Sequence, residues 1–132
     1  NAIREVLPGM MVRGWGRVVV VGSMADQRPL PGSAAYSVSK GALHPLVKGI
    51  AAEIDPVRYP DVLINELTPG ATQTAMSRAG KSPDAASRLI EKLIDLPRGA
   101  PSGKFFVEDR MIELNKSLKS ILRQLVSRRY RS

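Results

Sequence analysis

The chain has 132 residues, a formal net charge of +8 and 43% hydrophobic residues, values that indicate one globular domain with a hydrophobic core. It contains no cysteine and a single histidine, which excludes disulfides and thiolate metal sites and leaves little for a metal cluster. No apolar run approaches the roughly 18 residues that a membrane-spanning helix needs, so we expect a protein of the cytoplasm.

The first part of the chain alternates between helical and strand-like segments. Residues Ala2 to Arg13 are expected to form the end of a helix that is broken or bent near Pro8-Gly9. A β-branched strand from Arg17 to Gly22 follows, and a long helix then extends from about Ala35 to Ile54. Pro45 lies inside that helix, where a proline removes a backbone hydrogen bond and costs about 3 kcal/mol or produces a kink.

The second part of the chain supplies two more predicted strands, for a total of three at most. Residues Val62 to Leu67 form the next strand, and the strand–helix–strand order implies a parallel pair with a right-handed crossover. Ser82-Pro83-Asp84 is typical of a helix start, with a cap, a proline at the first position and an acid at the positive end of the dipole. The last strand is expected over residues 101–107.

Residues 110–132 differ in composition from residues 1–109 and are interpreted as a separate basic tail. They contain seven Lys and Arg residues against one Glu. Apolar residues recur at alternating spacings of three and four, which predicts an amphipathic helix: Met111, Leu114, Leu118, Ile121 and Leu125. This helix would dock on the domain or on a second subunit, or bind an anionic membrane surface or a nucleic acid.

Tyr36 and Lys40 form a pair with acid–base potential. On a helix they lie on one face, about 5–6 Å apart at Cβ. The ammonium would favour the phenolate and bring the pKa of Tyr36 from near 10 toward the working pH, which suits a general acid or base. Ser23, at the end of the strand before this helix, would donate a hydrogen bond to the same substrate oxygen.

The order of these motifs resembles the short-chain dehydrogenase/reductase family. Ser23 stands thirteen residues before the segment Tyr36-Ser37-Val38-Ser39-Lys40, and the second strand is followed by the segment Pro69-Gly70-Ala71-Thr72-Gln73-Thr74. The resemblance extends from about Val6 to Val107. It implies an α/β fold with part of a Rossmann-like, doubly wound parallel sheet, to which the C-terminal amphipathic helix is added. It also implies an oxidoreductase that interconverts a carbonyl and an alcohol by hydride transfer, with NAD or NADP as cofactor.

The resemblance also assigns roles to individual residues. Tyr36 would be the proton donor or acceptor, Ser23 would position the substrate oxygen, and Lys40 would lower the pKa of Tyr36 and bind the nicotinamide ribose. The backbone near Ala71 would meet the carboxamide, and Thr74 the carboxamide or a nearby phosphate. The implied cofactor-binding residues are therefore Tyr36, Lys40, Pro69, Gly70, Ala71 and Thr74.

The glycine-rich turn that holds the pyrophosphate in this family is not found in the chain. Gly14-Trp15-Gly16 precedes a strand instead of following one, and Asn1 does not match the asparagine that the family uses in a proton relay. Because a complete domain of this kind needs roughly 250 residues, we expect residues 1–109 to be the C-terminal half of one. The residues that set the preference between NAD and NADP would lie in the other half.

Subunit pairing is a further implication of the resemblance. The helices over Ala2–Arg13 and Ala35–Ile54 pair across a two-fold axis in the family, so a homodimer or homotetramer is expected. The alternative to an enzyme is a truncated, catalytically inactive relative that acts through subunit pairing or through its basic tail. His44 is interpreted as a packed or helix-surface histidine without a functional role.

Overall fold

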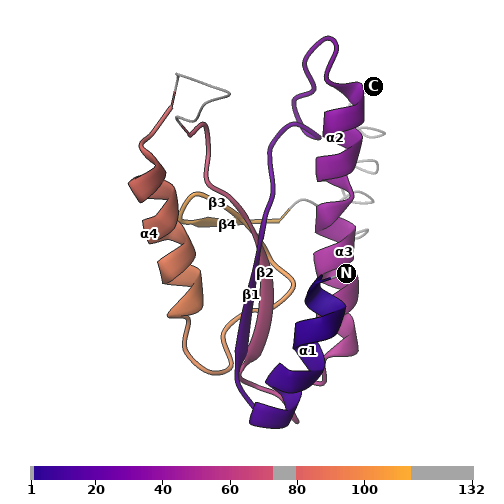
Figure 1. Ribbon diagram of the computed structural model, residues 1–132, viewed down its shortest axis with the longest axis vertical. Helices are drawn as coiled ribbons and strands as arrows, with labels where there is room; N and C mark the ends of the chain where they lie inside the picture. The colour runs from indigo at the N-terminus through magenta and orange to yellow at the C-terminus, as the bar shows by residue number, and fades with distance from the viewer. Residues whose placement is uncertain (1, 73–79, 114–132) are drawn as a thin grey trace, which may run out of the picture.

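A short sheet separates two layers of helices in the computed structural model, which describes residues 2–72 and 80–113 (Figure 1). The helices α1, α2 and α3 lie on one side of the sheet, and α4 lies on the other. In chain order the elements are α1 (Ala2–Arg13), β1 (Gly16–Val21), α2 (Ala34–Gly41), α3 (Leu43–Glu53), β2 (Val62–Thr68), α4 (Pro83–Ile94), β3 (Phe105–Val107) and β4 (Arg110–Ile112). The α/β fold class with a mainly parallel sheet is thus confirmed.

The four described strands form one sheet in the order β1-β2-β3-β4, with β1 at one edge. β1 and β2 are parallel and pair from Gly16 opposite Val62 to Val21 opposite Leu67. β3 is parallel to β2, and β4 is antiparallel to β3. Because β1 and β2 are parallel and start together, their C-terminal ends reach the same edge of the sheet, where the expected catalytic residues follow.

The core lies between the sheet and the layer of α1 and α3. The two alternating residues Val62 and Ile64 of β2 are almost fully buried and pack with Val47 and Ile54 of the α3 region. Side chains from α1 and β1 complete this cluster: Ile3, Leu7, Met10, Val18 and Val20. β2 is the central element, since all seven of its residues are buried. A central parallel strand covered on both faces has this continuous burial.

The long helix expected over Ala35 to Ile54 is interrupted at Ala42, so that two helices, α2 and α3, replace it. Pro45 explains the break, because it has no N–H to offer the carbonyl of Gly41 four residues earlier. Helical hydrogen bonds are formed on either side of this gap. Ala42 N–H donates to Val38 O, and Leu46 N–H donates to Ala42 O. The break lies two residues after Lys40, the charged residue of α2.

Three expectations about the elements need correction. α1 runs unbroken through Pro8, so of the break or bend expected near Pro8-Gly9 the break does not occur. The last parallel strand is short, because residues 101–104 are irregular and bind β2 through single hydrogen bonds such as Ile64 N–H to Ser102 Oγ. A fourth strand, β4, takes Arg110–Ile112, so the tail does not begin as a helix at residue 110. The rest of the predicted tail helix lies outside the described residues.

Candidate active site

Ser23 stands just beyond the C-terminal end of β1. Gly22 N–H donates to Leu67 O at 2.8 Å, which extends the pairing of β1 and β2 by one residue. Ser23 Oγ accepts a hydrogen bond from Ala25 N–H at 3.1 Å, and this contact fixes the side chain in the turn. A hydroxyl that accepts from a backbone amide still has its single proton to donate. Ser23 can therefore serve as a hydrogen-bond donor at this edge of the sheet.

Tyr36 and Lys40 lie one turn apart on α2, as their spacing predicts. Lys40 Nζ is 5.9 Å from the centre of the Tyr36 ring. The same ammonium donates to the carbonyl oxygen of Val21 at 3.3 Å, two residues before Ser23. Tyr36 is 49% exposed, so the residue is open to contact with a substrate. Lys40 thus connects the face of α2 that carries Tyr36 with the strand end that carries Ser23.

The third part of the site is the turn that follows β2. Gly70 has a φ of +81°, a conformation that glycine adopts without steric cost. Ala71 O accepts a hydrogen bond from Lys81 N–H at 2.8 Å, which holds the turn against the segment before α4. The register of β1 and β2 brings Ser23 and Pro69 to equivalent positions beyond the two strands. Thr74 lies outside the described residues.

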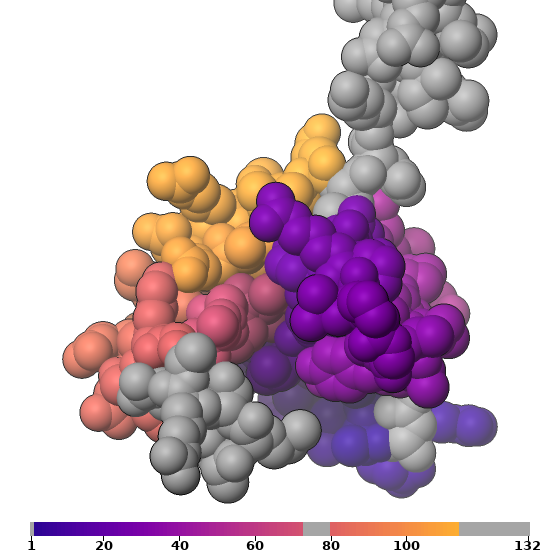
Figure 2. Space-filling view, turned by 90° about the horizontal axis from the view of Figure 1, so that it is seen from above, coloured from indigo at the N-terminus to yellow at the C-terminus, as the bar shows by residue number. Residues whose placement is uncertain are grey.

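Figure 2 shows the molecule from this edge of the sheet. The purple surface of the β1–α2 loop and of α2 lies beside the rose surface of the residues that end β2. Ligands of open α/β sheets bind in the crevice outside the carboxyl ends of the strands. The candidate site, made of Ser23, Tyr36, Lys40 and the Pro69–Ala71 turn, is at that end.

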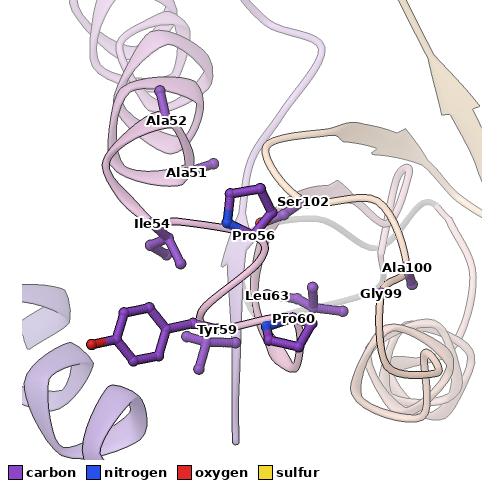
Figure 3. A pocket seen from close by; sticks show the side chains of 11 residues that line it. Ala51, Ala52, Ile54, Pro56, Tyr59, Pro60, Leu63, Gly99, Ala100 and Ser102 are labelled. Atoms are coloured by element: carbon purple, nitrogen blue, oxygen red, sulfur yellow. The ribbon is translucent and has the colours of Figure 1, made fainter. Parts of the chain in front are cut away.

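A hollow at the opposite end of the sheet does not coincide with these residues (Figure 3). It has a volume of about 390 Å³ and lies where α3 ends and β2 begins. Its walls are largely apolar and include Ala51, Ile54, Tyr59 and Leu63. The side chains in this hollow offer no acid–base pair, so it is not a candidate catalytic site.

Two ionisable residues beneath the site were not expected from the sequence to matter. Glu66 of β2 is 2% exposed, and its Oε2 is 3.4 Å from Nδ1 of His44, near the start of α3. Burial raises the pKa of Glu66 to about 7; the nearby Asp26 carboxylate also raises it, whereas Lys40 acts in the opposite direction. Burial also lowers the pKa of His44, as does the charge of Lys48, whereas Asp26 opposes this. The signal in the sequence was an acid within a largely apolar central strand, where charged residues are rare.

The family model described as "short chain dehydrogenase" matches residues 1–85, more than half of the chain. The chain belongs to the short-chain dehydrogenase family. Dehydrogenase/reductase SDR family member 4 of Homo sapiens is 43% identical over 75 residues, which cover 57% of this chain and 26% of that protein. Acetoacetyl-CoA reductase of Cupriavidus necator is 35% identical over 79 residues, which cover 60% of this chain and 31% of that protein.

Solved structures of this family agree with the fold. The crystal structure of acetoin dehydrogenase from Enterobacter cloacae superposes with a TM-score of 0.67 and 27% identity, over 80% of this chain and 47% of that one. The chain therefore spans about half the length of this solved structure and less than a third of the two curated relatives named above.

Two kinds of feature are absent from the described residues. Across residues 2–72 and 80–113, no helix is long and apolar enough to cross a membrane. The same part of the chain holds no group of three or more His, Cys, Asp or Glu side chains arranged to bind a metal ion.

Proposed function

We propose that this chain provides the catalytic half of an NAD(P)-dependent oxidoreductase that interconverts a carbonyl and an alcohol. The observation that carries the proposal is the position of Lys40, whose ammonium lies 5.9 Å from the Tyr36 ring and 3.3 Å from the carbonyl of Val21. It connects the acid–base candidate to the strand end that bears Ser23. Family membership supports the same class of reaction.

In the proposed reduction, Tyr36 donates its phenolic proton to the carbonyl oxygen of the substrate as that oxygen gains negative charge. Ser23 donates a hydrogen bond to the same oxygen, so that two donors stabilise the developing charge. The Lys40 ammonium favours the phenolate that Tyr36 leaves behind. In the direction of oxidation the proton moves from the alcohol to Tyr36, and the roles of Ser23 and Lys40 are unchanged.

The residues at this edge suit the nicotinamide end of a dinucleotide cofactor. Lys40 offers an ammonium to ribose hydroxyls, and the turn at Pro69, Gly70 and Ala71 offers backbone groups to a carboxamide. Tyr36 would lie close to the ribose, and Thr74 would add a hydroxyl to the carboxamide or to a phosphate. A bound nicotinamide dinucleotide supplies or accepts the hydride. The pyrophosphate would be held by a glycine-rich turn outside this chain.

The proposed substrate is a small-molecule carbonyl compound, as opposed to a macromolecule, or the corresponding alcohol. Two relatives are named for such compounds, acetoacetyl-CoA reductase and acetoin dehydrogenase. We further propose that the complete enzyme works in the cytoplasm as a homodimer or homotetramer.

Substitution of Tyr36 tests the assignment. In a protein that joins this segment to a cofactor-binding half, Tyr36→Phe is expected to lower kcat by about 10²- to 10⁴-fold, because it removes the general acid. Tyr59→Phe is the matched control, since Tyr59 lies in the hollow at the other end of the sheet and should leave turnover unchanged. Near-normal turnover of the Tyr36→Phe variant with carbonyl substrates would show that another group is the acid.

A catalytically inactive relative that acts through subunit pairing or its basic tail is the second candidate. It is favoured by the concentration of positive charge in residues 110–132. Titration with NADH and NADPH, followed by cofactor fluorescence, distinguishes the two candidates. Saturable binding once a cofactor-binding half is supplied supports the enzyme, and no binding in that form supports the inactive relative.

A further inference from the structure

A buried carboxyl group lies beneath the candidate site, in the middle of the sheet. Glu66 is 2% exposed on β2, the strand whose seven residues are all buried. It belongs to the same alternating set as Val62 and Ile64, so it faces the layer of α2 and α3. An isolated carboxylate in such a position is strongly disfavoured unless charged or hydrogen-bonding groups face it.

The backbone just after β1 leaves room for this carboxyl group at one residue, Gly22. A Cβ atom on Gly22 would collide with Glu66 Oε1, so only glycine allows the side chain to lie against the strand here. Val21 is the residue before Gly22. Its carbonyl oxygen accepts a hydrogen bond from Lys40 Nζ at 3.3 Å. The carboxyl group of Glu66 and the ammonium of Lys40 therefore lie against two adjacent residues, Gly22 and Val21 respectively.

Ionisable groups face Glu66 from three directions. His44 contributes its Nδ1 from α3 at 3.4 Å, Lys40 acts from α2, and Asp26 acts from the loop after β1. Lys48, one turn after His44 on α3, acts on the imidazole. On the side of β3 the neighbouring ring is Phe105, which packs edge-on against His44 at 5.5 Å and adds no charge. Of these groups, Lys40 is the cation that acts on Glu66 and also lies beside the ring of Tyr36.

We propose that Glu66 is a positioning residue for the Lys40 ammonium and that its ionisation controls the pH dependence of the reaction at Tyr36. As a carboxylate it attracts the ammonium to the Val21–Gly22 backbone and holds it in one place beside Tyr36. As a neutral acid it exerts no such attraction, and the side chain of Lys40, which is long and only half-buried, samples other rotamers. The inference rests on the proposed function, because only a working site has a reaction for Lys40 to serve.

The pKa of Glu66, about 7, places this change near neutrality. In the active form, kcat/KM should therefore fall as the pH drops through about 7, in addition to any effect of Tyr36 itself. The Glu66→Gln variant carries a permanently neutral group of the same shape. Its kcat/KM should not show this fall near pH 7. Above neutrality its kcat/KM should be about 3- to 10-fold below that of the wild type, a loss typical of one weakened electrostatic contact.

The first test measures the coupling between Glu66 and Lys40 without any reaction. The carboxyl carbon of Glu66 is titrated by NMR in the 132-residue chain and again in the form joined to a cofactor-binding half. Lys40→Met should raise the pKa of Glu66 by about half a unit or more, because a cation that favours the carboxylate is lost. Lys81→Met is the matched control, since the Lys81 ammonium pairs with Glu108, and it should cause no shift. A Glu66 midpoint that is the same in both variants and the wild type overturns the proposal.

The second test measures pH profiles of kcat/KM for the joined form, with folding checked by circular dichroism. If Glu66→Gln prevents folding, Asp26→Asn replaces it, because loss of the Asp26 charge should move the same fall in kcat/KM to lower pH. Profiles that coincide with the wild type overturn the inference and leave the proposed function intact. If instead the titration shows the Lys40 coupling but no variant or wild type turns over, the proposed function fails, and with it the catalytic role of Glu66.

Discussion

Glu66 occupies a position where a central strand normally carries an apolar side chain. Its seven-residue strand is buried throughout, and Gly22 leaves the space that the carboxyl group fills. Burial of an ionisable group makes folding depend on pH, because the folded and unfolded states bind protons with different affinities. The pH dependence of stability is therefore a residue-scale measurement of the environment of Glu66.

The Glu66→Gln variant should gain stability over the wild type as the pH rises. Glu66 has a pKa of about 7 when folded, against an ordinary value of 4.5. Its contribution to stability is complete below about pH 4.5 and is lost as the pH rises through 7, because the unfolded chain ionises more easily. The difference in unfolding free energy, variant minus wild type, should increase by roughly 1–3 kcal/mol between about pH 5 and about pH 8. Urea unfolding followed by far-UV circular dichroism measures it.

The Glu66→Gln variant and the wild type must be compared at each pH, because His44 also makes the stability of the wild type depend on pH. The pKa of His44 is lowered by burial, so its contribution to stability is present above about 6.5 and is lost as the pH falls. The two residues therefore act in opposite directions across neutrality. A difference between variant and wild type that stays flat with pH would mean that Glu66 is hydrated and ionises normally.

At the scale of elements, Pro45 divides what would otherwise be one helix. The variant Pro45→Ala restores the N–H that the carbonyl of Gly41 lacks and should join α2 to α3. We expect an increase in unfolding free energy of about 1–3 kcal/mol together with a stronger helical signal in circular dichroism. Gly49→Ala is the matched control: a methyl group there meets no neighbouring atom, so it should add only about 1 kcal/mol from helix propensity. Lower stability for Pro45→Ala would show that the break relieves strain elsewhere.

The helices and the two long strands were predictable because their signals are local. A run of valines, a serine–proline helix start and an internal proline each depend on neighbours in sequence. β4 was not predictable in this way, because Arg110–Ile112 is exposed and is a strand only through its pairing with β3. Local signals also failed at Pro8, where α1 continues because its apolar side chains, such as Leu7 and Met10, pack on the core.

In the candidate site, too, the residues with local sequence signals could be predicted, and those that depend on packing between distant segments could not. The positions of Ser23, Tyr36 and Lys40 at one edge of the sheet could be expected, since each is tied to the end of a strand or the face of one helix turn. The pairing of Glu66 with His44 could not, because it depends on how α3 lies across β2 and on the space that Gly22 leaves. An acid inside a largely apolar strand was the visible sign, but its partner His44 lies 22 residues away in sequence.

At the scale of the whole molecule, the face formed by α1 and α3 bears on assembly. Ile3, Leu7, Met10 and Ile50 pack against the core of the same chain. Val6 is 46% exposed and Leu46 is 39% exposed, so each retains apolar surface for a partner.

We expect the complete protein to be a dimer or tetramer, measured by light scattering at micromolar concentration. Val6→Glu should shift it toward smaller species, whereas Val57→Glu, an equally apolar but 88% exposed site in the turn before β2, should not. A stable monomer would contradict this.

The edge position of β1 governs how the 132-residue chain behaves by itself. β2 is buried over its whole length, but β1 is buried only at Gly16, and Val21 at its far end is 46% exposed. An exposed, apolar edge strand has unpaired backbone groups that invite pairing with other chains. Parallel sheets are stable when helices cover both faces and further strands cover the edges. The isolated chain should therefore be only marginally folded and prone to aggregate.

The isolated chain is also expected to have no dehydrogenase activity. Hydride transfer requires the nicotinamide within about 3–3.5 Å of the reacting carbon, and a pyrophosphate grip is needed to hold it there. Lys40 and the Pro69–Ala71 turn contribute only the ribose and carboxamide end. Addition of a cofactor-binding half, fused or as a separate chain, should restore solubility and NAD(P)H binding together, because the strands that cover β1 also carry the phosphate contacts. If the chain alone melts cooperatively and oxidises NAD(P)H with a carbonyl substrate, it holds a complete site, and the division of the site between two halves is wrong.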